Sequence, residues 1–486
     1  MSTTNVFLER IHEICQSVAQ TTSLEELYEH LIHFVSKACD APTSAFMTVA
    51  EYGTLSHSFR VGQGTGRFAN AAGETLRDEP AIKVLSNAIN QRSNHHDKNA
   101  IAFYFPHPEN FAVLIYVELQ QKISDENRKL LTFLNDSVTS SIQAHTSAKL
   151  AERSNRATVI ALASLAEHKD HDTGEHIMRV AIMTDEIVQV LGELGYYKEL
   201  ITPEFERLIS TASILHDVGK VTIPESILQK PAKLDPEERK IIESHTVKGQ
   251  RVLEKASRML DGNNYLLKLS SEIALYHHEH YNGQGYPTRI EGQQIPLAAR
   301  IVGLTDVFDA LASVRPYKKA WPEDETIGYI KNQSGRQFDP LIVEAFLKVM
   351  DYRREAELIQ WTEEMSVKVP HLDNDHRFLI ALINQLASAE KIGNRRIAES
   401  VLDELINYTL DHFQREEQFL QEMDFPDFAK HKRLHTSFAE TIQDVRWQYL
   451  HGFRPKINNE ILIFLRNWLS KHILIEDMKY TSPVSA

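Results

Sequence analysis

Cysteine is scarce in this sequence: only Cys15 and Cys39 occur among 486 residues, and they form no CxxC pair. A disulfide framework or a thiolate metal site needs more cysteines at closer spacing, so we expect neither. The longest apolar run, Phe111–Val117, falls far short of the roughly 18–20 residues that cross a bilayer. Because the N-terminus also lacks a basic-then-apolar signal pattern, we predict a cytoplasmic protein without a membrane partner.

Basic residues are fewer than acidic ones: 53 Lys and Arg against 67 Asp and Glu leave a formal net charge of −14. This charge repels polyanions, so we do not expect a nucleic-acid polymer as a partner. Histidine, in contrast, is abundant, and many of its 23 residues lie near Asp and Glu in the last two thirds of the chain. Imidazole and carboxylate groups are common metal ligands, so these clusters indicate where the function lies.

The length predicts about three domains. Residues 1–123 indicate an α/β domain, because helical apolar spacing is followed by the strand-like runs Ser44–Ala50 and Phe111–Leu119. Residues 153–352 and 366–486 show helical periodicity, and a charged connector at 353–365 separates them. We therefore predict a multidomain, mainly α-helical protein with an α/β domain at its N-terminus.

Residues 124–152 form a predicted linker helix. Neither Pro nor Gly occurs between Ile123 and Thr173, which favours one long helix or a helix pair with an apolar stripe suited to a homodimer seam. The alternative is an ordinary core-facing helix with a break near Ala148–Asn155.

Adjacent His216 and Asp217 begin a set of donors in the central region. An imidazole beside a carboxylate can bind one metal through nitrogen while the carboxylate reaches a second metal. Taken alone, a buried histidine is more often a hydrogen-bonded core residue. Together, the histidines and aspartates of this region suffice for two metals: His176, His216, Asp217, His245, His277, His278 and Asp306.

These donors lie in the motifs TGEHIMRV, HDVGK, HTVKG, HHEHYNGQGYP and DVFDALASVRPYK. In this order the motifs resemble those of the HD-GYP phosphodiesterases over residues 153–352. The resemblance implies an all-α HD-GYP domain with two or three Fe or Mn ions that hydrolyses cyclic di-GMP to pGpG and/or GMP.

The same resemblance implies roles for further residues. Asp217 and Lys220 would be catalytic, Arg315 and Lys318 would bind the phosphate, and the pocket mouth would be formed by Gly285, Tyr286 and Pro287. Members with a three-metal site carry Glu four residues before the first histidine, where this chain has Asp172. Two interpretations of Asp172 stay open: it is a ligand of a third metal, or it is an ordinary turn residue.

A second set of donors occupies the C-terminal region. His412 and Glu416 are four residues apart, as are His431 and His435, so each pair projects from one face of a helix. His376, His472 and Asp477 complete the set. A single pair of this kind is weak support for a metal site, but the whole set of donors, in this order along the chain, favours a metal site.

This series resembles the bacterial hemerythrin-like domains. The resemblance implies a four-helix bundle with two Fe ions and an oxo or hydroxo bridge. His431, His435 and His472 would hold one iron and His376 and His412 the other, while Glu416 and Asp477 bridge them, which leaves one coordination position open for O2. Five aromatic residues at helical spacing either exclude water from this pocket or are ordinary core residues: Trp361, Phe378, Phe413, Phe464 and Trp468.

The N-terminal region resembles a GAF-type sensory domain. The whole chain is therefore interpreted as a cyclic di-GMP phosphodiesterase regulated by O2 or redox state. Two alternatives stay open: a phosphohydrolase of another nucleotide, or an O2- or iron-binding protein with a silent HD-GYP scaffold.

Overall fold

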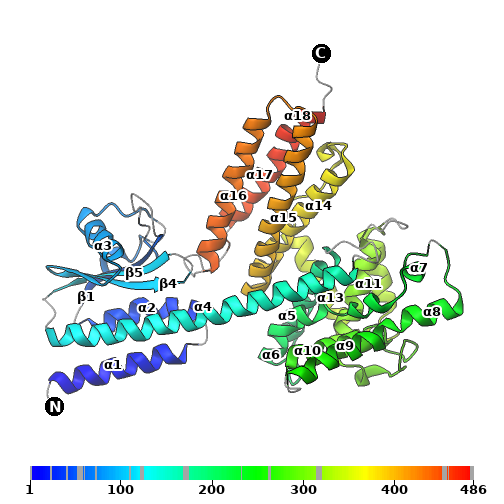
Figure 1. The fold of residues 1–486 in the computed structure, drawn as a ribbon, viewed down its shortest axis with the longest axis horizontal. Helices are drawn as coiled ribbons and strands as arrows, with labels where there is room; N and C mark the ends of the chain where they lie inside the picture. The colour runs from blue at the N-terminus through cyan, green and yellow to red at the C-terminus, as the bar shows by residue number, and fades with distance from the viewer. Residues whose placement is uncertain are drawn as a thin grey trace. The chain divides into compact units, whose positions relative to one another are not determined.

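The computed structural model describes residues 3–21, 24–39, 42–51, 59, 61–71, 74–108, 111–120, 125–167, 175–230, 232–260, 264–313, 320–450, 457 and 459–481. The chain forms two compact units. Met1–Arg153 and Asp444–Pro455 make the first unit, and Ser154–Gln443 and Lys456–Ala486 make the second. Figure 1 shows their helices and strands.

The first unit contains a five-stranded antiparallel sheet with the strand order β2-β1-β5-β4-β3. Its strands are β1 (Pro42–Glu51), β2 (Gly64–Thr65), β3 (His95–Asp97), β4 (Ala100–His107) and β5 (Phe111–Leu119). Both predicted strands are therefore confirmed as β1 and β5, which pair with Phe46 opposite Tyr116.

Side chains that alternate along the strands give this sheet two cores. Phe46 and Leu114 pack toward α3 (Glu79–Gln91), whereas Met47 and Ile115 pack toward α1 (Thr3–Gln20), α2 (Leu24–Ala38) and the start of α4. With both faces covered, the apolar runs of β1 and β5 are buried.

Helix α4 (Asp125–Glu167) is a single helix of 43 residues. The predicted long helix is confirmed, and the alternative with a break near residues 148–155 is wrong. Leu131, Leu134 and Val138 bury the first part of α4 in the core of the first unit.

The second unit is helical. Its central helices are α5 (Glu175–Leu194), α6 (Pro203–Ser213), α7 (Glu225–Leu228), α8 (Pro236–Glu243), α9 (His245–Met259), α10 (Tyr265–Tyr276), α11 (Leu297–Ala312), α12 (Glu323–Asn332) and α13 (Pro340–Ala356). Residues such as Ile187, Ile209, Ile273, Ile301 and Phe346 form one buried cluster shared by α5, α6, α10, α11, α12 and α13. This cluster holds the ends of α5, α6, α10 and α11 in fixed positions.

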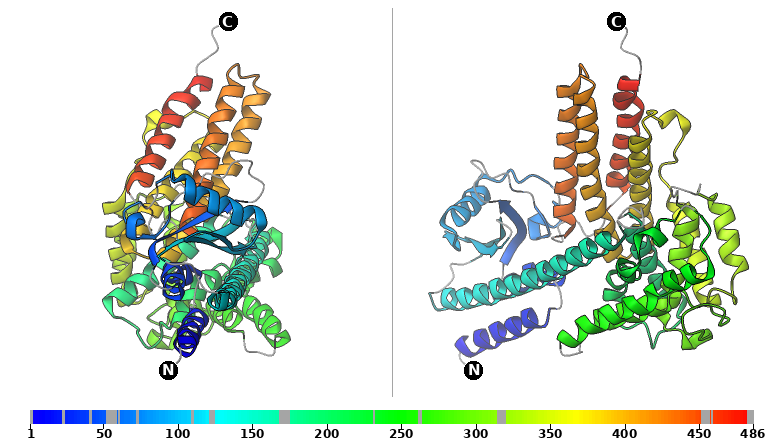
Figure 2. Two further views of the ribbon diagram at one scale, coloured as in Figure 1. Left: turned by 90° about the vertical axis from the view of Figure 1, so that its left-hand side faces the viewer. Right: turned by 45° about the vertical axis from the view of Figure 1, so that its right-hand side comes forward.

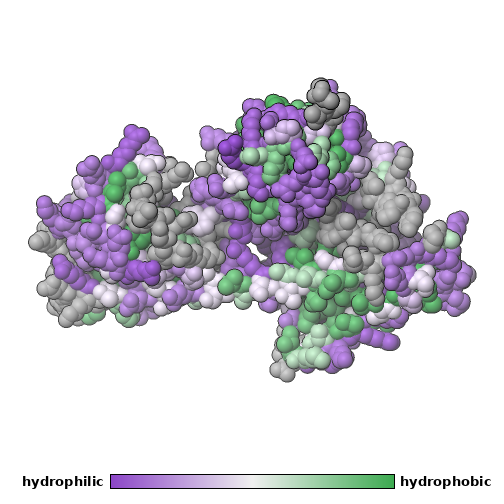
Figure 3. Space-filling model, turned by 45° about the horizontal axis from the view of Figure 1, so that its top comes forward, coloured by the Kyte–Doolittle hydropathy of each residue, from purple (hydrophilic) through white to green (hydrophobic). Residues whose placement is uncertain are grey.

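The C-terminal helices run side by side as a bundle (Figures 1 and 2). They are α14 (Pro370–Ile392), α15 (Arg395–Glu422), α16 (Phe428–Leu450), α17 (Asn459–Lys471), the π-helix η6 (His472–Asp477) and α18 (Met478–Thr481). The face drawn in Figure 3 has large hydrophilic areas and also a hydrophobic patch. None of the helices in the described ranges combines the length and apolar character that crossing a membrane requires.

Candidate metal centres

Most predicted donors of the central domain lie at helix ends, where backbone direction changes sharply. They are His176 in the first turn of α5, His216 and Asp217 after α6, His245 at the start of α9, His277 and His278 after α10, and Asp306 within α11. Residues from five helices thus approach one region.

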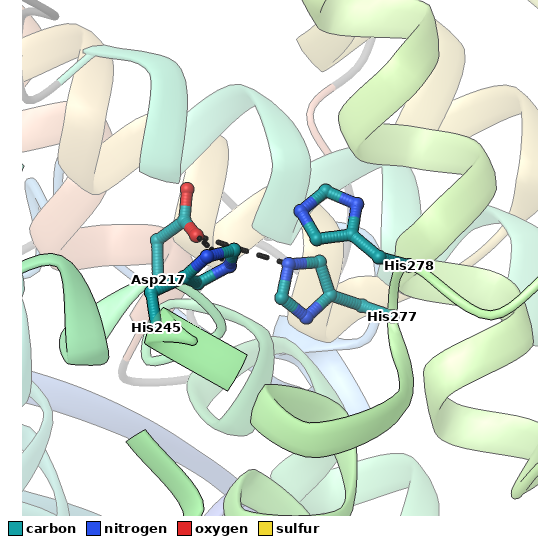
Figure 4. A group of neighbouring side chains, drawn as sticks. All are labelled: Asp217, His245, His277 and His278. Atoms are coloured by element: carbon teal, nitrogen blue, oxygen red, sulfur yellow. Dashed lines mark ion pairs between the residues drawn. The ribbon is translucent and has the colours of Figure 1, made fainter. Parts of the chain in front are cut away.

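The first donor group contains Asp217, His245, His277 and His278, each with one ligand atom within 4.8 Å of the others. Asp217 Oδ1 lies 3.1 Å from His245 Nε2 and 3.8 Å from His277 Nε2 (Figure 4). These three buried atoms have no hydrogen-bond partner within the described part of the chain. Because unpartnered buried polar atoms are costly, their arrangement fits a cation.

The second donor group contains His176, His216 and Asp306. Asp306 Oδ1 lies 3.5 Å from His176 Nε2 and 3.9 Å from His216 Nε2. Asp217 connects the groups, because its Oδ2 lies 3.4 Å from His216 Nε2 while its Oδ1 faces the first group. A carboxylate in this position is suited to bridge two metal ions.

Hydrogen bonds to the backbone determine which ring nitrogen faces the site. Nδ1 of His216, His245 and His277 each lies 2.7–2.9 Å from a carbonyl oxygen three or four residues earlier in the chain. A carbonyl only accepts, so Nδ1 carries the proton and Nε2 presents its lone pair.

Burial and a nearby cation shape the protonation of this site. Burial would raise the pKa of Asp217, but Lys220 Nζ, 2.7 Å from Asp217 Oδ2, and His216 hold that pKa well below its usual range. Burial lowers the pKa of His277 to about 4. At neutral pH the site therefore offers an ionised carboxylate and a neutral imidazole, the forms that bind metals.

Asp309 supports a predicted donor and was not predicted from the sequence. Its Oδ2 lies 2.6 Å from His176 Nδ1, and Arg179 binds both of its oxygens, at 2.5 and 3.0 Å. Burial opposes its ionised form, but these hydrogen bonds with His176 and Arg179 lower its pKa. The motifs DVFDA and HIMRV contain Asp309 and Arg179, but the sequence analysis looked only for metal donors, and neither residue was among those predicted.

Gly219 allows the HDVGK turn to approach α9. A Cβ atom at this position would lie 1.9 Å from the carbonyl oxygen of His245. Only glycine lets the backbone after Asp217 pass this close to His245.

The loop that contains Gly285, Tyr286 and Pro287 lies beside the first donor group. The Tyr286 ring stacks on His278 at a centroid distance of 4.8 Å, and a Cβ at Gly285 would lie 2.5 Å from the His278 carbonyl oxygen. Glu279 was also missed: its Oε1 accepts hydrogen bonds from the Thr288 backbone and hydroxyl groups at 2.6 and 2.7 Å. Glu279 therefore holds the loop after Pro287 against the site.

Three predicted residues of the central site, Asp172, Arg315 and Lys318, lie outside the described residues.

The predicted C-terminal donors form two further groups that share Glu416. One group is Glu416, His431, His435 and His472, and the other is His376, His412 and Glu416. They come from α14, α15, α16 and η6, and each of them is at most 4% exposed.

Asp477 and Glu416 lie between the two groups. Asp477 Oδ1 is 3.1 Å from His472 Nε2, while its Oδ2 is 3.3 Å from His376 Nε2. Glu416 Oε2 is 3.2 Å from His435 Nε2 and 3.6 Å from His412 Nε2. Both carboxylates therefore face donors of both groups, as a bridging ligand requires.

The π-helix η6 brings Asp477 to the same side as His472. Residues five apart point about 140° away from each other in an α-helix. In a π-helix the hydrogen bonds run from i to i+5, so these residues lie one above the other. Helical spacing alone would not have paired His472 with Asp477.

The C-terminal site leaves polar atoms without partners. Among the described residues, neither nitrogen of His376 or His431 and neither carboxylate oxygen of Asp477 has a hydrogen bond. Burial lowers the pKa of His376, and burial together with Glu416 raises that of Asp477 in the absence of a cation. Histidine nitrogens and carboxylate oxygens in this arrangement fit two iron ions.

Aromatic side chains cover this site. Phe413 stacks on His435 at 3.7 Å, and Trp468 stacks on His472 at 4.5 Å between ring centroids. Phe413 and Trp468 thus contact the donors directly.

Three family models match the chain. They are described as an HD domain (residues 150–342), a hemerythrin HHE cation binding domain (residues 367–482) and a domain of unknown function, DUF3369 (residues 5–145). The chain therefore joins an HD domain to a hemerythrin domain, and both domain types imply bound metal. The third match does not support the predicted GAF identity.

Named proteins resemble parts of the chain. A cyclic di-GMP phosphodiesterase of Vibrio cholerae is 42% identical over 191 residues, which cover 39% of each protein. The 3'3'-cGAMP-specific phosphodiesterase 2 of the same organism is 33% identical over 56% of this chain and 50% of its own length. A hemerythrin crystal structure is 32% identical, with a TM-score of 0.25, and covers 26% of this chain and 99% of its own. The chain thus spans half or less of the two phosphodiesterases.

Proposed function

We propose that the central domain is a metal-dependent phosphodiesterase that hydrolyses cyclic di-GMP to pGpG and/or GMP. The observation that carries this proposal is the position of Asp217, with one oxygen toward each of two donor groups. Similarity to proteins named as cyclic di-GMP phosphodiesterases supports the substrate.

Two bound Fe or Mn ions would supply a hydroxide at neutral pH and neutralise the phosphodiester charge. The chain's own part is to hold the donors: Asp217 would bridge, and the histidines would present Nε2. Lys220, 2.7 Å from Asp217, balances the carboxylate charge and lies within reach of a phosphate oxygen placed there. We further propose that Arg315 and Lys318 bind the phosphate and that Asp172 is a candidate third-metal ligand.

The test is Asp217→Asn in the full chain. We expect loss of cyclic di-GMP turnover of about 100-fold or more and a lower metal content, because loss of an outer partner alone already costs 10–100-fold. Asp324→Asn is the matched control, since Asp324 is 88% exposed. Unchanged hydrolysis by the Asp217 variant would contradict the proposed site.

The same assay should be run with 3'3'-cGAMP as a second candidate substrate, because a similar protein is named as a 3'3'-cGAMP-specific phosphodiesterase. The described donors suit metal ions, and none of the described donors is a group that would distinguish one base from another. Competition between cyclic di-GMP and 3'3'-cGAMP for turnover separates these substrates.

For the C-terminal domain we propose two iron ions with an oxo or hydroxo bridge that bind O2 and report oxygen or redox state. Buried donors with unpartnered atoms support this proposal. Iron analysis and near-ultraviolet bands of an oxo-bridged centre test it. If the central domain were a catalytically silent scaffold, the protein would bind iron at the C-terminal bundle but would hydrolyse no cyclic dinucleotide.

Contacts within the second unit support coupling of the two sites. Helix α5 carries His176 and also Asp185, which lies 2.5 Å from Arg396 Nη2 at the start of α15. Arg396→Gln should weaken the dependence of hydrolysis on the iron oxidation state without removing hydrolysis. Arg395→Gln, whose Nε contacts Glu399 one turn along α15, is the control.

The domain boundaries, the GAF-type identity of the first domain, the cytoplasmic location and a homodimer through α4 stay proposals. Analytical ultracentrifugation of the full chain addresses the homodimer.

A further inference from the structure

A carboxylate stands behind one histidine in each donor group of the C-terminal site. Glu417 Oε1 lies 3.1 Å from His435 Nδ1, and Asp375 Oδ2 lies 3.2 Å from His412 Nδ1. In both rings the opposite nitrogen, Nε2, faces Glu416. Each carboxylate therefore accepts a hydrogen bond from Nδ1–H, which leaves the Nε2 lone pair directed toward the metal position.

The two carboxylates have different surroundings. Asp375 also accepts hydrogen bonds from Tyr408 at 2.8 Å and Arg415 at 2.9 Å, and although burial opposes this, the three donors lower its pKa to about 2. Glu417 has Lys432 Nζ at 2.8 Å, and the Lys432 side chain is 53% exposed. Tyr408 and the partly exposed Arg415 thus compensate the charge of Asp375, whereas the more exposed Lys432 compensates that of Glu417.

Glu417 also lines a surface groove between α15 and α16. The groove has a volume of about 570 Å³, and its wall includes Phe413, Glu417, Lys432, His435 and Glu440. Adjacent residues on a helix point about 100° apart, so Glu416 faces the donors while Glu417 faces the groove. The groove brings solvent close to the outer side of one metal-facing histidine.

We infer that Glu417 is a positioning residue that holds His435 in its metal-facing tautomer and, through its charge, favours the oxidised state of the iron centre. This inference rests on the proposed di-iron function. A carboxylate hydrogen-bonded to a ligating imidazole makes the ring a stronger donor, which stabilises ferric over ferrous iron. Lys432 partly cancels this effect, so the pair sets the balance between the two states.

The experiment compares full-length wild type, Glu417→Gln and Glu440→Gln after loading with iron. Glutamine keeps the size of Glu417 but removes its charge, and Glu440→Gln removes one charge from the same groove. Iron content, near-ultraviolet bands and the reduction potential are measured for each. We expect the ferrous state to gain about tenfold in Glu417→Gln, equivalent to about 59 mV for a one-electron couple, and to change little in Glu440→Gln.

Lys432→Gln gives an independent test that leaves Glu417 in place. Removal of the lysine charge should shift the equilibrium toward ferric iron, opposite to Glu417→Gln. If Glu417→Gln binds too little iron for its reduction potential to be measured, the potential of Lys432→Gln tests the inference instead.

The outcomes separate the inference from the function beneath it. Full iron loading with unchanged potentials in both Glu417→Gln and Lys432→Gln would overturn the inference and leave the di-iron site standing. Equal shifts in Glu417→Gln and Glu440→Gln would also overturn it, because general groove charge would then be the cause. Absence of iron and of oxo-bridge bands in the wild type would overturn the proposed function itself, and the inference with it.

Discussion

Asp309 Oδ2 lies 2.6 Å from His176 Nδ1, although the two residues are 133 positions apart in the chain. Arg179 holds the same carboxylate from the next turn of α5. A ring supported in this way presents its other nitrogen to the donor group with little rotational freedom.

Asp309→Asn should therefore weaken metal binding by the central domain by about 10–100-fold, as is typical for loss of such a partner. The amide keeps the shape but no longer accepts strongly from His176. Metal affinity is measured by competition with a chelator, and Asp324→Asn provides a charge-matched control. Equal affinity in both variants would show that Asp309 does not support His176.

Gly219→Ala should destabilise the second unit by about 1–3 kcal/mol, the usual cost of forcing extra atoms into a packed site. The new methyl group would meet the His245 carbonyl oxygen at 1.9 Å and push α9 away from Asp217. Gly328→Ala in α12 is the control, because outside its own helix backbone and chain neighbours no atom of the described residues lies within 4 Å of the added Cβ. Alanine should stabilise that helix by about 0.5–1 kcal/mol. Urea unfolding measures both.

Acidification should destabilise the metal-free protein between about pH 6.5 and pH 4. Burial lowers the pKa of His277 to about 4 in the folded protein, whereas an unfolded histidine titrates near 6.5. In this window the unfolded chain binds a proton that the folded site does not, so the free energy of unfolding falls as pH falls, by up to about 1.4 kcal/mol per pH unit.

His277→Gln checks this explanation, because it removes the titrating ring. Its urea midpoint should fall less steeply with acidification than that of the metal-free wild type. Parallel slopes would assign the pH effect to other groups.

Deletion of Ile475 should leave iron binding by the C-terminal site largely intact. A π-helical turn contains one residue more than an α-helical turn, so removal of one residue converts η6 to an α-helix and places Asp477 four positions after His472, still on the same face. Ile475 is 54% exposed, so little packing is lost.

Deletion of Asn467, an exposed residue of the regular helix α17, is the contrasting variant. It rotates everything after residue 467 by about 100° relative to the bundle and should abolish iron binding. Iron per chain after reconstitution distinguishes the two deletions. Similar iron loss in both would mean that the π-turn itself is needed.

Local patterns in the sequence were enough to nominate the metal donors. His216 and Asp217 are adjacent, and His431 and His435 share a helix face by simple spacing, so their proximity needs no tertiary information. Asp309, Glu279 and Glu417 were missed for a common reason. None of them is expected to bind metal, and each acts on a partner that only folding brings close.

The order and chemistry of the donors, the helical class of the last two thirds and the two N-terminal strands were thus determined by the sequence alone, because they depend on local spacing and residue type. Only the tertiary structure decided which oxygen of Asp217 faces which group, that a π-turn aligns Asp477 with His472, and which carboxylates support the metal-facing rings. These features depend on distances of about 3 Å between separate helices, and packing of the whole core sets such distances.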